Sequence, residues 1–228
     1  MNTTPLQAIV FDMDGLMFNT EDLYNLAGQQ LLAPRGQEFT RELKLAMMGL
    51  PGQEAFSVMI ERCGLDDSVE QLKSETDEIF RTLLPEKIEM MPGLQTLLDA
   101  IDDAGLPRAV ATSSHRNFAD RALGHFDLQP GFQFVLTSDD VTKGKPDPEV
   151  YQTASRKLGV PPAAILVLED SVFGSRAAVA AGAFTVAVPT EFSRDQDYSH
   201  ADAVVDRLDS PNVLGWVENQ RIPAKSGD

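Results

Sequence analysis

The chain alternates short, continuously apolar runs with helical segments, and this alternation limits its possible folds more than any other feature. Residues rich in apolar or β-branched side chains predict strands at 8–11, 107–111, 134–136, 165–168, 184–188 and 203–205. Between them, apolar residues spaced three and four apart predict helices, including 94–103, 118–123, 149–158 and 172–181. Strands without polar positions are typical of parallel sheets that helices cover on both faces. The predicted fold class is therefore α/β, with a doubly wound parallel sheet.

The stretch from Met17 to Glu86 interrupts the alternation. It contains no convincing strand pattern, but it contains several helical ones, such as EDLYNLAGQQLLA and SVEQLKSETDEIFRTLL. We therefore predict a small α-helical cap domain over residues 17–86, inserted after the first strand. The core domain would then consist of residues 1–16 and 87–228.

The composition argues against several classes of partner. The formal net charge of -16 would repel nucleic acids and anionic membrane surfaces, so neither is expected as a partner. A single cysteine, Cys63, allows no intrachain disulfide and favours a cytoplasmic location. The N-terminal MNTTPLQ lacks the basic region of a signal peptide. If the substrate is an anion, a metal ion or a local cation must offset the acidic field.

Polar side chains follow the predicted strands at the edge where open parallel sheets bind their ligands. In chain order they are Asp12, Asp14, Thr112, Ser113, Lys145, Glu169 and Asp170. Two carboxylates about 4 Å apart repel by about 4 kcal/mol at an effective dielectric constant near 20, so a cation must lie among them. Oxygen ligands without a nearby histidine or cysteine favour Mg²⁺.

Each of these features has a simpler structural explanation when it is taken alone. Aspartates and a glycine after a strand can form an ordinary turn, in which glycine supplies a positive φ. Thr112, Ser113 and the EDS segment at 169–171 can be helix N-caps, and Lys145 can be a solvated surface lysine. The coincidence of all of them at one predicted sheet edge favours a catalytic metal site.

Four segments, FDMDG, ATSS, KGKPDP and VLEDSVFGSRAAVAAGA, resemble in this order the four motifs of the haloacid dehalogenase-like superfamily. The branch they resemble has a helical cap after the first strand and includes β-phosphoglucomutase-like and sugar-phosphate phosphatases. The resemblance extends over residues 9–188. It implies a Rossmann-like core and an Mg²⁺-dependent hydrolase that acts on a phosphate ester.

The resemblance also implies roles for individual residues. Asp12 would be the nucleophile that forms an aspartyl-phosphate, and Asp14 would be the general acid and base. Thr112 and Lys145 would complete the catalytic group by binding the phosphoryl group. The implied metal ligands are Asp12, Asp14 through its main-chain carbonyl, Glu169 directly or through water, and Asp170. The expected substrate-binding residues are Ser113, Ser114, His115 and Arg116, against the alternative that the last three only begin a helix.

The resemblance favours a phosphatase that acts on a small phosphorylated metabolite, above all a sugar phosphate. Asp14 argues against a dehalogenase, which needs no acid at that position. A hexose-phosphate mutase of the β-phosphoglucomutase type is the alternative, although Gly52 and Tyr24 stand where such mutases have an arginine and a histidine. A receiver-like, phosphorylation-dependent signalling module is a remote alternative, because receivers are shorter and lack the helical insertion.

Overall fold

The chain forms two compact units in this computed structural model, which describes residues 3–47, 50 and 52–224. The first unit comprises Met1–Asn19 and Glu89–Asp228, and the second comprises Thr20–Ile88. The second unit is thus an insertion into the first. It begins and ends slightly later in the chain than the range of 17–86 expected for the cap.

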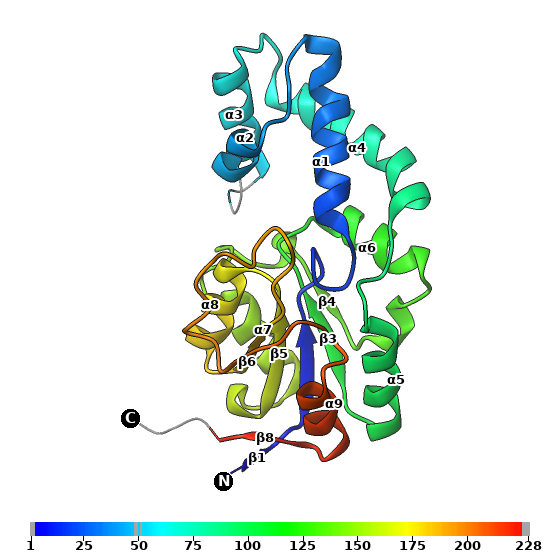
Figure 1. The fold of residues 1–228 in the computed structure, drawn as a ribbon, viewed down its shortest axis with the longest axis vertical. Helices are drawn as coiled ribbons and strands as arrows, with labels where there is room; N and C mark the ends of the chain where they lie inside the picture. Colours follow the sequence, from blue (N-terminus) through cyan, green and yellow to red (C-terminus); the bar gives the residue numbers. More distant parts are fainter. Residues whose placement is uncertain (1–2, 48–49, 51, 225–228) are drawn as a thin grey trace. The chain divides into compact units, whose positions relative to one another are not determined.

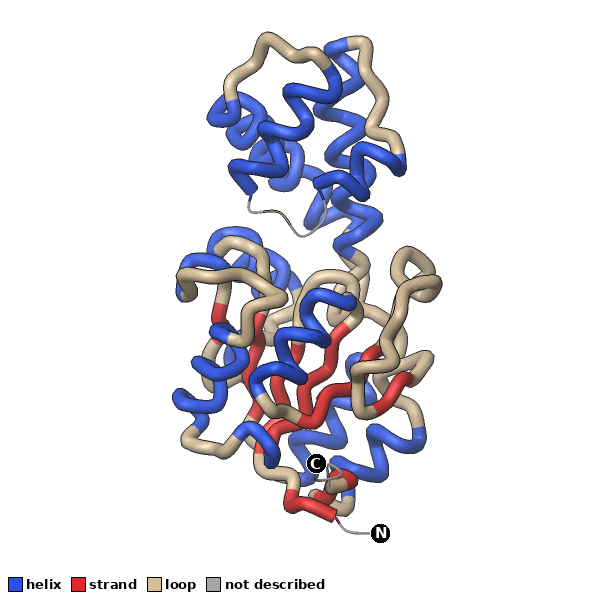
Figure 2. The backbone as a smooth tube through the Cα atoms, turned by 90° about the vertical axis from the view of Figure 1, so that its left-hand side faces the viewer, coloured by secondary structure: helices blue, strands red, loops and turns tan. Residues whose placement is uncertain are grey.

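The first unit is built on a parallel sheet, which has six strands within the described residues (Figures 1 and 2). Its order is β4-β3-β2-β5-β6-β7, and every neighbouring pair is parallel. The strands are β2 (Ala8–Phe11), β3 (Arg108–Ala111), β4 (Val135–Leu136), β5 (Ile165–Glu169), β6 (Phe184–Ala187) and β7 (Ala203–Val204). The predicted doubly wound parallel sheet is confirmed, and β2 lies in its interior.

Helices cover both faces of this sheet. They are α5 (Leu94–Ala104), α6 (Arg116–His125), α7 (Glu149–Leu158), α8 (Val172–Ala181) and α9 (Pro211–Glu218). Helix α5 packs beside α9 and α7 packs beside α8, and Figure 1 shows α5 on the opposite side of β2 and β3 from α7 and α8. Short 3-10 helices complete the connections: η2 (Gln129–Gly131), η3 (Ser138–Asp140) and η4 (Pro162–Ala164).

The alternation of side chains along the central strands decides which residues leave the sheet on which face. One buried cluster joins α7 and α8 to alternate strand residues, among them Ala8, Val10, Ala109, Ala111, Ile165 and Val167. Side chains two residues apart in a strand point to the same face, so the next side chains on this face are Asp12 after β2 and Glu169 at the end of β5. The strand pattern therefore directs both carboxylates toward the side of the sheet where α7 and α8 pack.

Two short strands were not predicted from the sequence. Strand β1 (Thr3–Pro5) pairs antiparallel with β8 (Arg221–Pro223) to form a separate small sheet. Their segments, TTP and RIP, are three residues long, and each ends in a proline, a residue that is rare in β-strands. Pairing between the two ends of the chain, which a local pattern cannot reveal, specifies them.

The second unit is helical in its described residues. It contains α1 (Thr20–Leu32), η1 (Ala33–Arg35), α2 (Arg41–Met47), α3 (Gly52–Cys63) and α4 (Val69–Lys87). Its own buried hydrophobic cluster contains residues from α1, α2, α3 and α4, namely Leu31, Leu32, Leu43, Met59 and Leu72. Within the described parts of both units, no helix has the length and apolar character needed to cross a bilayer.

Candidate active site

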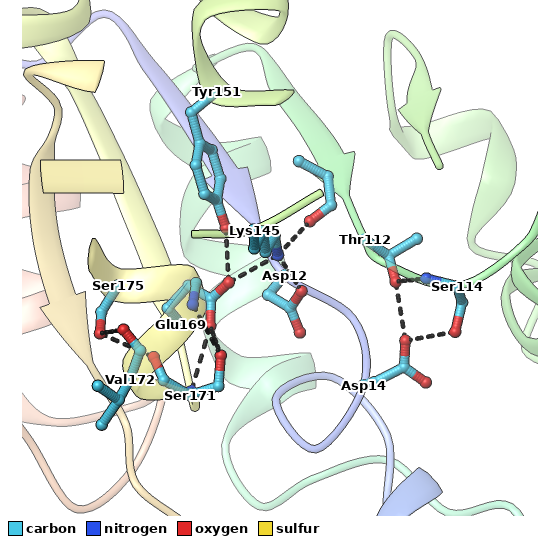
Figure 3. Close-up of polar contacts among 12 residues, drawn as sticks. Asp12, Asp14, Thr112, Ser114, Lys145, Tyr151, Glu169, Ser171, Val172 and Ser175 are labelled. Carbon is cyan, nitrogen blue, oxygen red and sulfur yellow. Dashed lines mark hydrogen bonds and ion pairs between the residues drawn. The ribbon is translucent and has the colours of Figure 1, made fainter. Parts of the chain in front are cut away.

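Side chains from separate segments of the first unit meet at the C-terminal edge of the parallel sheet (Figure 3). Asp12 follows β2, Lys145 comes from the loop before α7, and Glu169 ends β5. Asp12, Glu169 and Asp170 are buried, and one oxygen of each lies within 4.8 Å of the others. The structure thus brings together acidic and basic residues that lie more than a hundred positions apart in the sequence.

Lys145 lies at the centre of this arrangement. Its ammonium donates to Asp12 Oδ1 at 2.5 Å, to Glu169 Oε1 at 2.6 Å and to the carbonyl oxygen of Ala111 at 2.9 Å. An ammonium has three N–H donors, so all of them are used. The side chain is only 6% exposed, which rules out the alternative that Lys145 is a solvated surface lysine.

Burial raises the pKa of Asp12 well above its ordinary value, and the nearby carboxylates of Glu169 and Asp14 act in the same direction, while Lys145 opposes them. Burial would lower the pKa of Lys145, but Asp12 and Glu169 outweigh it and raise that pKa well above its ordinary value. Lys145 therefore stays charged. Two buried carboxylates contact this ammonium and a third, Asp170, lies beside them, so the site is suited to a divalent cation as a second positive group.

The carboxylate of Glu169 is fully occupied by hydrogen bonds. Oε1 accepts from Lys145 and, at 2.7 Å, from the hydroxyl of Tyr151. Oε2 accepts from the main-chain N–H of Ser171 at 3.2 Å and from its hydroxyl at 2.9 Å. A carboxylate offers about four lone-pair sites. Proximity alone would allow Glu169 to bind a cation directly, but its hydrogen bonding favours the alternative in which it does not.

The oxygen groups at this edge fit a magnesium ion. Asp12, Glu169 and Asp170 are the carboxylates whose positions would allow them to hold it, and the family resemblance adds the main-chain carbonyl of Asp14. All of them offer the hard oxygen atoms that Mg²⁺ prefers. The backbone of Asp170 is fixed, because its carbonyl oxygen accepts from Ser193 Oγ at 2.9 Å and from the Tyr198 hydroxyl at 2.5 Å. The metal ligand roles of these residues stay predictions.

Asp14 lies in a different environment from Asp12. Its Oδ2 accepts from Thr112 Oγ1 and from Ser114 Oγ, both at 2.8 Å (Figure 3). Thr112 Oγ1 in turn accepts from the main-chain N–H of Ser114 at 3.0 Å. The next residue, Gly15, has a φ of 75°, which the turn after Asp14 requires and which side chains disfavour. Two hydroxyls thus hold Asp14, whereas an ammonium holds Asp12.

The other expected substrate-binding residues lie at the start of α6. Ser113 is exposed in the loop before it. His115 Nδ1 lies 3.0 Å from Asp139 Oδ1, and Arg116 Nη2 donates to Asp140 at 2.6 Å and to the carbonyl oxygen of Val135 at 2.9 Å. These contacts tie both side chains to η3 and its surroundings. Substrate binding by Ser113, Ser114, His115 and Arg116 therefore stays a prediction.

Tyr151 and Gly174 contact this site but were missed by the sequence reasoning. Tyr151 is buried on α7 together with Val150 and Ala154, and in the sequence it therefore resembles an ordinary core residue. A signal did exist, because a tyrosine hydroxyl in an apolar stripe needs a hydrogen-bond partner. Gly174 lies in the first turn of α8, where a β-carbon would come within 1.7 Å of Glu169 Oε1.

Comparison with known proteins identifies relatives along most of the chain. Residues 9–188 match the family model described as haloacid dehalogenase-like hydrolase. The chain is 33% identical over 177 residues to a phosphorylated carbohydrates phosphatase from Thermotoga maritima, covering 78% of this chain and 82% of that protein.

Solved structures agree with this family match. CbbY from Rhodobacter sphaeroides, in complex with phosphate, has 28% sequence identity and a TM-score of 0.80, and the match covers 90% of this chain and 95% of that one. A mutant of the same protein in complex with xylulose-(1,5)bisphosphate matches with equal identity, coverage and TM-score.

Proposed function

Since the chain belongs to the haloacid dehalogenase-like hydrolase family and is a hydrolase of the phosphatase type, we propose that it hydrolyses a small sugar phosphate with Mg²⁺. The reaction would pass through an aspartyl-phosphate on Asp12. The observation that carries this proposal is the contrast between two neighbouring carboxylates, one bound by the Lys145 ammonium and the other by two hydroxyls. Two carboxylates in different environments can act as nucleophile and as proton donor.

Asp12 is suited to the role of nucleophile. Lys145 engages its Oδ1, and within the described part of the chain no hydrogen bond engages Oδ2. This second oxygen would form a bond to phosphorus while the bond between phosphorus and the leaving oxygen breaks. Lys145 would offset negative charge on both Asp12 and the transferring phosphoryl group, in a site that excludes most water.

Asp14 would manage the protons of both steps. In the first step its carboxylic acid gives a proton to the leaving oxygen of the sugar. In the second step its carboxylate takes a proton from the water that attacks the aspartyl-phosphate, which releases inorganic phosphate and restores Asp12. The hydroxyls of Thr112 and Ser114 orient Asp14, and Thr112 would donate to a phosphoryl oxygen once substrate is bound.

The metal ion would be held by Asp12, Asp170 and the main-chain carbonyl of Asp14, with Glu169 acting through Lys145. When bound, Mg²⁺ supplies positive charge for the phosphoryl oxygens and a template for in-line displacement. The acidic chain otherwise offers little attraction to an anionic substrate, since its net charge is -16. The cytoplasmic location expected from the single cysteine is part of the same proposal.

The names of the relatives support a sugar phosphate as the substrate class. One relative is a phosphorylated carbohydrates phosphatase, and a mutant of one solved relative is in complex with xylulose-(1,5)bisphosphate. Ser113, His115 and Arg116 adjoin Thr112 and Ser114 in the sequence, and we expect them to contact the sugar or a second phosphate. Nucleic acids and membranes are not expected as partners.

A screen for phosphate release tests this proposal. Sugar monophosphates, sugar bisphosphates, nucleotides and phosphorylated acids would each be incubated with the protein, with and without Mg²⁺, alongside an Asp12→Asn control. We expect Mg²⁺-dependent release from at least one sugar phosphate and none from the control. Phosphate release from no compound, or equal release by the control, would contradict the proposal. Conversion of β-glucose 1-phosphate to glucose 6-phosphate with a bisphosphate primer, without free phosphate, would favour a mutase instead.

A further inference from the structure

Tyr151 connects α7 to the charged centre of the site, although it lies in none of the loops that carry the proposed chemistry. Its side chain is 2% exposed and belongs to the buried cluster between the sheet and helices α7 and α8. Its hydroxyl donates to Glu169 Oε1 at 2.7 Å, and its ring centroid lies 5.1 Å from Lys145 Nζ. Figure 3 shows the ring reaching from α7 toward Glu169 and Lys145.

The position of Glu169 is determined from several sides. Tyr151 and Lys145 bind one oxygen, and the N–H and hydroxyl of Ser171 bind the other. Gly174 leaves room for the carboxylate beside the first turn of α8, because any β-carbon there would overlap it. The side chain is 0% exposed. Glu169 is thus held between two helices, with both of its oxygens engaged inside the protein.

This arrangement matters because Glu169 has two competing partners. It can neutralise Lys145, or it can turn an oxygen toward the cation expected beside Asp12 and Asp170. Both are possible because one carboxylate oxygen of each of the three residues lies within 4.8 Å of the other two. In the second case Lys145 would lose one of its three acceptors and would no longer be held at a single position against Asp12. The Tyr151 hydroxyl, as a second donor to Oε1, favours the first arrangement.

We propose that Tyr151 is a positioning residue of the phosphatase: its hydroxyl keeps Glu169 bound to Lys145 and away from the metal ion. The inference rests on the proposed function and refines it, because it assigns Glu169 to the ammonium and leaves Asp12 and Asp170 as the side-chain ligands of the metal. Tyr151 itself touches neither the substrate nor the reacting atoms.

The variant Tyr151→Phe tests this inference, because it removes the hydroxyl and keeps the ring over Lys145. Ser155→Ala is the matched control, since it removes another buried hydroxyl from α7, one that donates to the carbonyl oxygen of Val160 at 2.6 Å. We expect Tyr151→Phe to lower kcat by about tenfold, as is typical for residues that orient catalytic groups, with KM nearly unchanged. Ser155→Ala should keep the wild-type kcat. Equal kcat values for the two variants would overturn the inference.

Titration of the substrate-free protein with MgCl₂ by calorimetry provides a readout that does not depend on turnover. If Tyr151 keeps Glu169 from the metal, Tyr151→Phe binds Mg²⁺ as tightly as the wild type or more tightly. If Glu169 is instead a metal ligand that Tyr151 supports, the variant should bind Mg²⁺ about tenfold or more weakly. This second result would overturn the inference. Neither outcome depends on whether the substrate is known.

A double-mutant cycle separates positioning from a general packing effect. In a Glu169→Gln background, Tyr151→Phe should change kcat by less than about twofold, because its partner is already altered. A repeated tenfold loss would mean that Tyr151 does not act through Glu169, which contradicts the proposal. Thermal unfolding of each variant shows whether any loss in kcat follows a loss of folded protein. A wild type that hydrolyses no phosphate ester would contradict the proposed function, whereas an active wild type with an equally active Tyr151→Phe contradicts only this inference.

Discussion

Replacing Gly174 by alanine is expected to destabilise the first unit, although the same change stabilises most helices. The new β-carbon would lie 1.7 Å from Glu169 Oε1, 2.0 Å from Cδ and 2.3 Å from Oε2. Glu169 is completely buried and cannot swing into solvent. The carboxylate would have to move by more than about 1 Å, which exceeds the tolerance of its hydrogen bonds.

The size of the effect follows from three contributions. Overpacking a buried site costs about 1–3 kcal/mol, and the loss of one hydrogen bond to a charged group costs about 1.5–3 kcal/mol. The higher helix propensity of alanine offsets about 1 kcal/mol of this. We expect a net loss of about 3 kcal/mol in the free energy of unfolding. In a chain of this size, such a loss corresponds to a decrease of about 6–12 °C in Tm.

Gly215→Ala is the matched control. Gly215 lies inside α9, and a β-carbon there would meet no atom within 4 Å, so this change should stabilise the protein by about 0.5–1 kcal/mol. Denaturant unfolding of both variants measures the difference, and phosphate release measures the accompanying loss of kcat. If Gly174→Ala is as stable as Gly215→Ala, the position of Glu169 described above is wrong.

Three further outcomes test the charged groups. Lys145→Ala should lower kcat by at least about 100-fold, since the variant lacks the ammonium that would offset negative charge on the transferring phosphoryl group. Lys143→Ala should not, because the Lys143 side chain is 72% exposed, and similar losses in both variants would argue against the assignment. Asp14→Asn should slow the phosphorylation of Asp12 and also the attack of water on the aspartyl-phosphate, so steady-state phosphate release falls, whereas unchanged release would exclude Asp14 as the acid and base. Chelation with EDTA should abolish turnover, and added MgCl₂ should restore it and raise Tm; metal-independent turnover would contradict the role of Mg²⁺.

The sheet and its reactive edge could be predicted because their signals are local. Continuously apolar runs identified the central strands, and the polar residues at their ends had to meet once the strands were parallel. The period of two even places Asp12 and Glu169 on the same face of the sheet. The small sheet of β1 and β8 lacks such a signal, because its segments are short and become strands only through contact with each other.

The hydrogen bonds within the site could not be predicted, because they depend on side-chain geometry. The sequence places Glu169 next to Asp170 as a predicted metal ligand, but it does not reveal that the oxygens of Glu169 also accept hydrogen bonds from Lys145, Tyr151 and Ser171. In the sequence, Gly174 resembles the other small residues of a tightly packed helix. The structure shows that a glycine is needed there because a β-carbon would overlap the carboxylate of Glu169. Residue identity thus predicted which groups meet, and the fold decides how they share their hydrogen bonds.

The most direct test of the proposed mechanism is to locate the phosphoryl group on the protein during turnover. The Asp14→Asn variant would be mixed with its best substrate, quenched rapidly in acid, digested and analysed by mass spectrometry. We predict a phosphoryl group on the side chain of Asp12 that appears as fast as the leaving group is released and is absent when Asp12 is also replaced by asparagine. Release of the leaving group with no phosphoryl group on Asp12, or with one on another residue, would contradict the account.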